Sequence, residues 1–205
     1  MHGQGLRYLA LGDSYTIGEG VPEAGRWPVQ LVQALRAQGI ALQSPQIVAT
    51  TGWTSEELAA AIDAAAPAGD YDLVSLGIGV NDQYRGRSVD QYRAQFAVLL
   101  ERAIGFASNR PARVLVLSIP DWGLTPFAIA QQRDGAATSA QIDAFNAAAQ
   151  ALCRARGVAF VDITPLSRAH GHQADMLAGD GLHPSPAMYA LWAALALPAA
   201  RNALA

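Results

Sequence analysis

The run Arg7-Tyr-Leu-Ala-Leu-Gly-Asp-Ser-Tyr15 sets the architecture expected for this 205-residue chain. Its first five residues are almost all apolar, which is typical of a strand buried on both faces of a parallel sheet. The strand gives way at Gly12 to the polar pair Asp13-Ser14. Because ligands bind at the carboxyl ends of the strands in open parallel sheets, we expect Ser14 to lie at a binding edge.

Four further strand candidates alternate with long amphipathic runs. Such alternation indicates an α/β fold, a three-layer α/β/α sandwich around a five-stranded parallel sheet. Right-handed crossovers favour the flavodoxin-like strand order 2-1-3-4-5. We expect one domain over residues 1–205. The predicted strands are Arg7–Leu11, Gln46–Thr50, Tyr71–Leu76, Arg113–Ile119 and Val158–Ile163, and the predicted helices begin at Trp27, after Thr54, Ser88 and Thr138, and at Pro186.

Helix starts and loops follow from local signals. The capping-box pattern, a hydroxyl residue followed three residues later by Glu or Gln, occurs at Thr54, Ser88 and Thr138. Two long stretches between predicted strands and helices, Pro120–Ala137 and Thr164–His183, are expected to be irregular. Both follow strands, so both are predicted to lie at the carboxyl edge.

Composition excludes several classes of function. All 14 basic residues are arginine, so a Walker-type phosphate loop and a Schiff-base lysine are both excluded. The single cysteine, Cys153, excludes an intrachain disulfide framework and a zinc site of several thiolates. A net charge of -3 gives no basic field for nucleic acid. No run approaches the roughly 20 apolar residues of a membrane span, so we expect no stable membrane insertion.

The first residues bear on location. Met1–Leu6 is a short polar lead without the apolar core of a secretory signal. We therefore expect a cytoplasmic protein if the chain is complete, and a periplasmic or secreted one if a signal has been removed. The sequence makes no prediction of oligomeric state.

Polar residues at the strand exits suggest nucleophilic catalysis. In the predicted order, Ser14 stands between Gly52, after the second strand, and Asn81, after the third. A serine hydroxyl needs a base in order to attack an ester, and a neutral histidine is the usual one. His183 has Asp180 three residues before it, which can fix its tautomer and stabilise the imidazolium. Activity is then expected to rise with pH through about 6.5.

An oxyanion hole is available at the same edge. A tetrahedral intermediate needs hydrogen-bond donors aimed at its oxygen. The backbone N–H groups of Ser14 and Gly52 and the side-chain amide of Asn81 could supply three. Asp13 and Asp82 are expected to hold the loops by hydrogen bonds rather than to act as acids.

Four blocks in this order resemble those of the SGNH hydrolases, the GDSL-type esterases and lipases. The blocks are Gly12-Asp13-Ser14-Tyr15, Gly52, Gly79-Val80-Asn81-Asp82 and Asp180-Gly181-Leu182-His183. The resemblance implies a serine esterase with Ser14, Asp180 and His183 as the triad and with Ser14, Gly52 and Asn81 as the oxyanion hole. Trp27-Pro28 also resembles the lysophospholipase/thioesterase branch. Tyr15 departs from the leucine of the family name, and we expect it to change the pocket wall.

The expected substrate is a small-molecule acyl ester of short to medium chain, turned over without a metal or cofactor. Candidate pocket residues are Tyr15, Asp121, Trp122, Met176 and Leu182. A thioesterase or lysophospholipase would use the same catalytic residues, and a non-catalytic binding protein is the alternative from another class. Two further patterns are disfavoured, a dinucleotide fingerprint at Gly77–Asp82, which lacks its third glycine, and a metal site at His170, His172 and Asp175.

Overall fold

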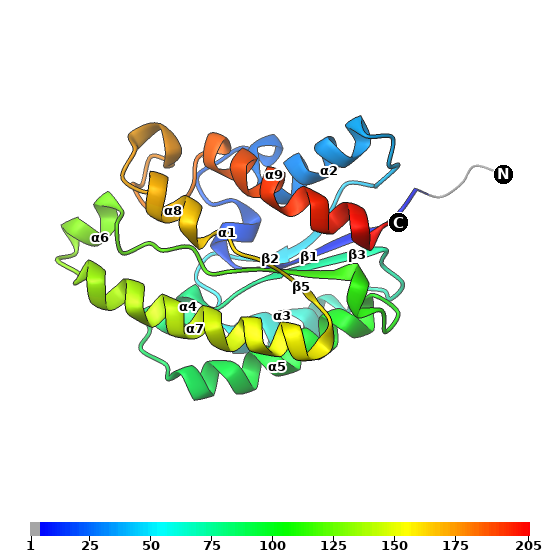
Figure 1. Ribbon diagram of the computed structural model, residues 1–205, viewed down its shortest axis with the longest axis horizontal. Helices are drawn as coiled ribbons and strands as arrows, with labels where there is room; N and C mark the ends of the chain where they lie inside the picture. Colours follow the sequence, from blue (N-terminus) through cyan, green and yellow to red (C-terminus); the bar gives the residue numbers. More distant parts are fainter. Residues whose placement is uncertain (1–4) are drawn as a thin grey trace.

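A five-stranded parallel sheet forms the middle layer of the protein (Figure 1). The computed structural model describes residues 5–205, so the polar lead predicted over Met1–Leu6 falls largely outside the described residues. The strands run in the order β2-β1-β3-β4-β5, and every neighbouring pair is parallel, which confirms the predicted class and order. Their bounds are β1 (Tyr8–Gly12), β2 (Gln46–Ala49), β3 (Leu73–Gly77), β4 (Val114–Leu117) and β5 (Ala159–Val161).

The register of the central strands aligns their carboxyl ends. Gly12, the last residue of β1, pairs with Ala49 of β2 on one side and with Gly77 of β3 on the other. These are also the last residues of their strands. The three loops that follow therefore leave the sheet at one level, and their polar residues meet at one edge.

Helices cover both faces of the sheet (Figure 1). α2 and α9 pack together on one face, while α3, α5 and α7 lie on the other. Among residues 5–205, no helix has the length and apolarity needed to cross a membrane. The helices are α1 (Ser14–Ile17), α2 (Trp27–Ala37), α3 (Ser55–Ala65), α4 (Val80–Tyr84), α5 (Val89–Phe106), α6 (Pro126–Ala130), α7 (Gly135–Arg156), α8 (Thr164–His170) and α9 (Pro186–Ala203), with 3-10 turns at Glu23–Gly25, Pro111–Arg113 and Ala174–Met176.

Two of the three predicted capping boxes are confirmed. Thr54 caps α3 and Ser88 caps α5, each with the reciprocal side-chain bond from the third helical residue. The third prediction is wrong, because α7 begins one turn earlier. Asp134 caps it by accepting a hydrogen bond from Ala137 N at 3.0 Å. Thr138 lies in the first turn and donates its hydroxyl to the Asp134 carbonyl.

The two stretches predicted to be irregular each contain a short helix. Pro120–Ala137 includes α6 and the first residues of α7, and Thr164–His183 includes α8. Both short helices carry proline in the first turn, where its missing N–H costs nothing. The correction matters for the site, because α6 carries Phe127, a residue at this edge of the sheet.

Candidate active site

A cavity of about 210 Å³ lies where the loops after β1, β2 and β3 meet. It brings together four of the residues proposed from the sequence to carry the chemistry. Asp180 does not line the cavity but bonds to His183, which does. The lining residues are Ser14, Tyr15, Thr51, Gly52, Val80, Asn81, Tyr84, Trp122, Phe127, Leu182 and His183.

Ser14 is the first residue of α1 and is almost fully buried. Asp13 caps this helix, since its Oδ1 accepts the Tyr15 N–H at 3.0 Å. A Cβ at Gly12 would lie 2.5 Å from the Gly77 carbonyl oxygen, so only glycine lets β1 approach β3 this closely. The turn therefore places the Ser14 side chain at the cavity directly beyond the sheet.

Two backbone donors at the cavity have no internal acceptor. Within residues 5–205, the N–H groups of Ser14 and Gly52 donate to no other residue. Gly52 has φ +84°, a conformation that favours glycine. Its carbonyl accepts Arg85 Nη2 at 2.7 Å, and Arg85 in turn pairs with Glu57. Arg85 therefore holds the peptide that follows Gly52, on the other side of the Cα from the N–H donor.

Asn81 presents its side-chain amide from the first turn of α4. Its Nδ2 donates one N–H to the Trp53 carbonyl at 2.9 Å. An amide carries two N–H donors, so one remains for the cavity that Asn81 lines. Gly79 makes this turn possible: its φ is +126°, and a Cβ there would lie 2.5 Å from the Tyr92 ring.

Two buried carboxyl groups hold the loops around the cavity, as predicted. Asp82 accepts the Ser55 N–H at 2.9 Å and the Ser55 hydroxyl at 3.0 Å, which ties α4 to the start of α3. Burial raises the pKa of Asp82 above its ordinary value. Burial also raises the pKa of Asp13 to about 7, although the bond from Tyr15 N lowers it in part.

Asp180 and His183 form a pair within one turn. The His183 Nδ1 donates to Asp180 Oδ2 at 2.6 Å, and Asp180 Oδ1 accepts the backbone N–H of both Leu182 and His183. Burial tends to raise the pKa of Asp180, but the bonds from His183 and Leu182 bring it below its usual value. An ionised Asp180 accepts only, so Nδ1 carries the proton and Nε2 is left as the basic atom.

The apolar side of the cavity is largely aromatic. Tyr15, Trp122 and Leu182 line it, as proposed from the sequence. The Tyr15 ring lies 5.2 Å from the His183 ring, centre to centre. Sequence reasoning missed Tyr84 and Phe127. Tyr84 lies one helical turn after Asn81, in the short helix α4, which was not predicted from the sequence. Phe127 falls in a stretch predicted to be irregular.

Two pocket candidates lie elsewhere. Asp121 does not line this cavity; its side chain is buried, and its carboxylate accepts hydrogen bonds from Arg168 and Ser139. Met176 ends a 3-10 turn and packs against the hydrophobic core. Asp121 was proposed because it follows a strand and Met176 because it shortly precedes Asp180 and His183, but neither position tells which way a side chain points.

The other groups considered from the sequence, His170, His172, Asp175 and Cys153, do not line this cavity. Across the described range, residues 5–205, no cluster of three His, Cys, Asp or Glu side chains is arranged to hold a metal ion. His170 Nδ1 lies 3.3 Å from Gln173 Oε1. Burial raises the pKa of the Cys153 thiol to about 12, so at neutral pH it is not a thiolate nucleophile.

Fold, cavity and sequence together define a serine ester hydrolase built on a three-layer α/β/α sandwich. The model of the GDSL-like lipase/acylhydrolase family matches residues 10–191. The chain belongs to this family, and the resemblance seen in its four sequence blocks is confirmed. A comparison with curated proteins gives no match.

Solved structures share the fold at low sequence identity. TesA superposes with a TM-score of 0.76 and 22% identity, covering 97% of this chain and 99% of TesA. The psychrotrophic esterase EstA from Pseudoalteromonas sp. superposes with a TM-score of 0.73 and 15% identity, covering 95% of this chain and 96% of EstA. A mutant of Axe2, an acetyl-xylooligosaccharide esterase from Geobacillus Stearmophilus, superposes with a TM-score of 0.72 and 20% identity, covering 96% of this chain and 94% of the Axe2 chain. The similarity extends over the whole sandwich.

Proposed function

We propose that this enzyme hydrolyses short- to medium-chain acyl esters of small molecules through an acyl-enzyme on Ser14. His183 is the general base and Asp180 its orienting partner. One observation carries the proposal: Ser14, His183 and the donors of Gly52 and Asn81 share a single cavity. A nucleophile, a base and oxyanion donors around one empty volume are what acyl transfer requires.

The proposed reaction has two halves. His183 Nε2 takes the Ser14 proton as Oγ attacks the acyl carbon, and the carbonyl oxygen becomes an oxyanion. The backbone N–H groups of Ser14 and Gly52 and the Asn81 amide bind that oxygen. The imidazolium, stabilised by Asp180, then gives its proton to the leaving alcohol. Water then gives a proton to His183 as it attacks the acyl carbon. The bond between that carbon and Ser14 Oγ breaks to release the acid, and the imidazolium returns its proton to Oγ.

The apolar wall supports an acyl group as the part of the substrate that fills the cavity. Trp122, Phe127 and Leu182 line it, and Trp122 is 3% exposed. A cavity of about 210 Å³ bounded by such side chains suits a short or medium acyl chain. A thioester or a lysophospholipid would meet the same nucleophile.

The test is hydrolysis of p-nitrophenyl butyrate by wild type, Ser14→Ala and Ser44→Ala. Ser44 is exposed just before the amino end of β2, whereas the cavity lies at the carboxyl ends of the strands, so Ser44 serves as the matched control. We expect Ser44→Ala to retain wild-type activity and Ser14→Ala to lose it by a factor of about 10⁴ or more. Equal rates for Ser14→Ala and wild type would overturn the proposal.

A covalent probe separates catalysis from simple binding. A fluorophosphonate should label wild type on the peptide that contains Ser14, as read by mass spectrometry, and should leave Ser14→Ala unlabelled. Absence of both labelling and turnover in folded wild type would favour the non-catalytic binding protein. Faster turnover of a butyryl thioester than of the matched oxygen ester would favour a thioesterase.

A further inference from the structure

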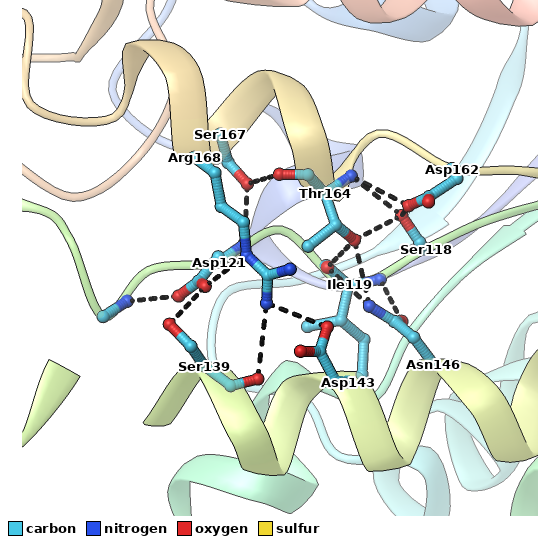
Figure 2. Close-up of polar contacts among 11 residues, drawn as sticks. Ser118, Ile119, Asp121, Ser139, Asp143, Asn146, Asp162, Thr164, Ser167 and Arg168 are labelled. Carbon is cyan, nitrogen blue, oxygen red and sulfur yellow. Dashed lines mark hydrogen bonds and ion pairs between the residues drawn. The ribbon is translucent and has the colours of Figure 1, made fainter. Parts of the chain in front are cut away.

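The segment between β4 and α6 is held by side chains from the α7 and α8 region (Figure 2). Ser118 Oγ accepts the N–H of Ile163 at 2.8 Å and that of Thr164 at 3.1 Å. Asn146 binds both backbone groups of Ile119, its Oδ1 accepting the N–H and its Nδ2 donating to the carbonyl. The backbone is therefore fixed before it reaches the cavity wall.

Asp121 is the centre of this arrangement. Its Oδ2 accepts Ser139 Oγ at 2.6 Å and Arg168 Nε at 2.8 Å, its Oδ1 accepts the Gly123 N–H at 3.0 Å, and its own N–H donates to Ser167 Oγ at 2.7 Å. We call Asp121, Ser139, Ser167 and Arg168 the Asp121 clamp. Figure 2 shows the Arg168 guanidinium reaching across from α8 to meet the carboxylate and α7.

The clamp needs an explanation beyond stability. The Asp121 side chain is fully buried, so its charge has been taken out of water. A buried ion pair contributes little net stability, and apolar residues of similar volume often do as well or better. What the clamp does provide is geometry, because the Asp121 carboxylate accepts three hydrogen bonds at once and the guanidinium is shared between Asp121 and Asp143. The clamp fixes the position of what it holds.

What it holds is Trp122. The N–H groups on either side of this residue, those of Asp121 and Gly123, are both bonded within the clamp. The indole N–H donates to Gln83 Oε1 at 2.8 Å, and the ring contacts Tyr84 and Phe127 at centroid distances of 5.4 and 6.4 Å. Tyr84, Trp122 and Phe127 all line the cavity. The clamp thus holds the backbone that carries Trp122, beside the aromatic side of the cavity.

We propose that Asp121 and Arg168 are positioning residues that set the length of acyl chain accepted, by holding Trp122 as a fixed wall of the cavity. The proposal rests on the proposed function, since it concerns the same cavity. With the clamp intact, the Trp122 side chain cannot move aside, so it sterically excludes a long acyl chain. When a substitution breaks the clamp, the Trp122 side chain can move, and longer acyl chains fit into the cavity. Neither residue touches the reacting atoms.

The test measures kcat/KM for p-nitrophenyl butyrate and p-nitrophenyl decanoate. We expect wild type to prefer the butyrate, and Asp121→Asn and Arg168→Gln to lower the butyrate-to-decanoate ratio by about tenfold, the discrimination that apolar pockets reach for small changes in chain length. Arg168→Lys, which keeps the charge, should retain more of the preference than Arg168→Gln. Asp143→Asn is the matched control, because Asp143 binds the same guanidinium from an exposed position and does not contact the loop.

The outcomes separate the clamp from a purely structural role. A structural role predicts lower melting temperatures and equal loss on both esters, with the ratio unchanged, and that result would overturn the inference. So would a wild type without chain-length preference. If Asp121→Asn does not fold, Ser139→Ala removes one donor and leaves the ion pair, and should give a smaller shift in the same direction. Failure of the proposed function shows itself separately, as full activity in Ser14→Ala.

Discussion

Asp13 stands directly before Ser14, and its carboxyl group is almost fully buried. Burial raises its pKa from 3.8 to about 7, and a bond from the Tyr15 N–H opposes this only in part. Asp13→Asn removes the titration and keeps a side-chain oxygen for that bond, since asparagine caps helices as well as aspartate does. We expect the substitution to remove a loss of stability that wild type suffers as the pH rises towards neutrality.

The sign and size of this effect follow from linkage. The unfolded chain ionises Asp13 at about 3.8 and the folded protein at about 7, so between these values only the folded state holds the proton. The free energy of unfolding therefore falls as pH rises from about 4 to about 7 and is level above that range. Each pKa unit corresponds to about 1.4 kcal/mol, so the whole effect is of the order of 4 kcal/mol.

Urea unfolding at several pH values between 5 and 8 measures this pH dependence of the free energy of unfolding. Differences between wild type and variant cancel the titration of all other groups that the two proteins share. We expect Asp13→Asn to gain about 3 kcal/mol on wild type between pH 5 and pH 8. Asp90→Asn is the control, because this side chain is 85% exposed and should follow wild type. Parallel curves for Asp13→Asn and wild type would refute the argument that burial retains the proton.

Three further predictions concern the site. Asn81→Ala should lower kcat on p-nitrophenyl butyrate by about 10²–10³, with near wild-type KM, because it removes one oxyanion donor. Asp180→Asn should lower kcat by about 10⁴, because His183 would then adopt the wrong imidazole tautomer. The reaction of Ser14 with a fluorophosphonate should slow in parallel. A loss of less than about tenfold would argue against a role for the Asp180–His183 hydrogen bond. Gly79→Ala should lower the free energy of unfolding by about 3 kcal/mol through strain and a clash with an aromatic ring. Gly86→Ala, also at positive φ but with nothing within 4 Å of the new Cβ, should cost about 1 kcal/mol, and equal urea midpoints for the two would contradict this account.

The sheet and the longer helices are predictable from the sequence because their signals are local. Apolar runs mark the strands, and hydroxyl caps mark α3 and α5. The start of α7 was misplaced because Asp134 and Thr138 are both good caps one turn apart, and the sequence alone does not tell which one ends the preceding loop. The Thr-Pro pairs at 125–126 and 164–165 are helix-start signals that could have identified α6 and α8.

The candidate site divides in the same way. Ser14, Gly52 and Asn81 follow strands whose order is predictable, so their meeting at one edge could be foreseen. The role of Asp121 could not, because its partners Ser139 and Arg168 are 18 and 47 residues away. These contacts form because α7 and α8 pack near the carboxyl end of β4. Tertiary packing determines that arrangement, and no local sequence pattern predicts it.

The turn that carries Asp180 and His183 has a consequence for biosynthesis. In the proposed mechanism the base His183 and its partner Asp180 lie three residues apart and are made together, whereas Ser14 emerges from the ribosome far earlier. Only the assembled sheet, with α9 packed against α2, brings the late turn to the early one. If the proposed residues carry the reaction, a nascent chain that has not yet released α9 should therefore be unable to cleave esters.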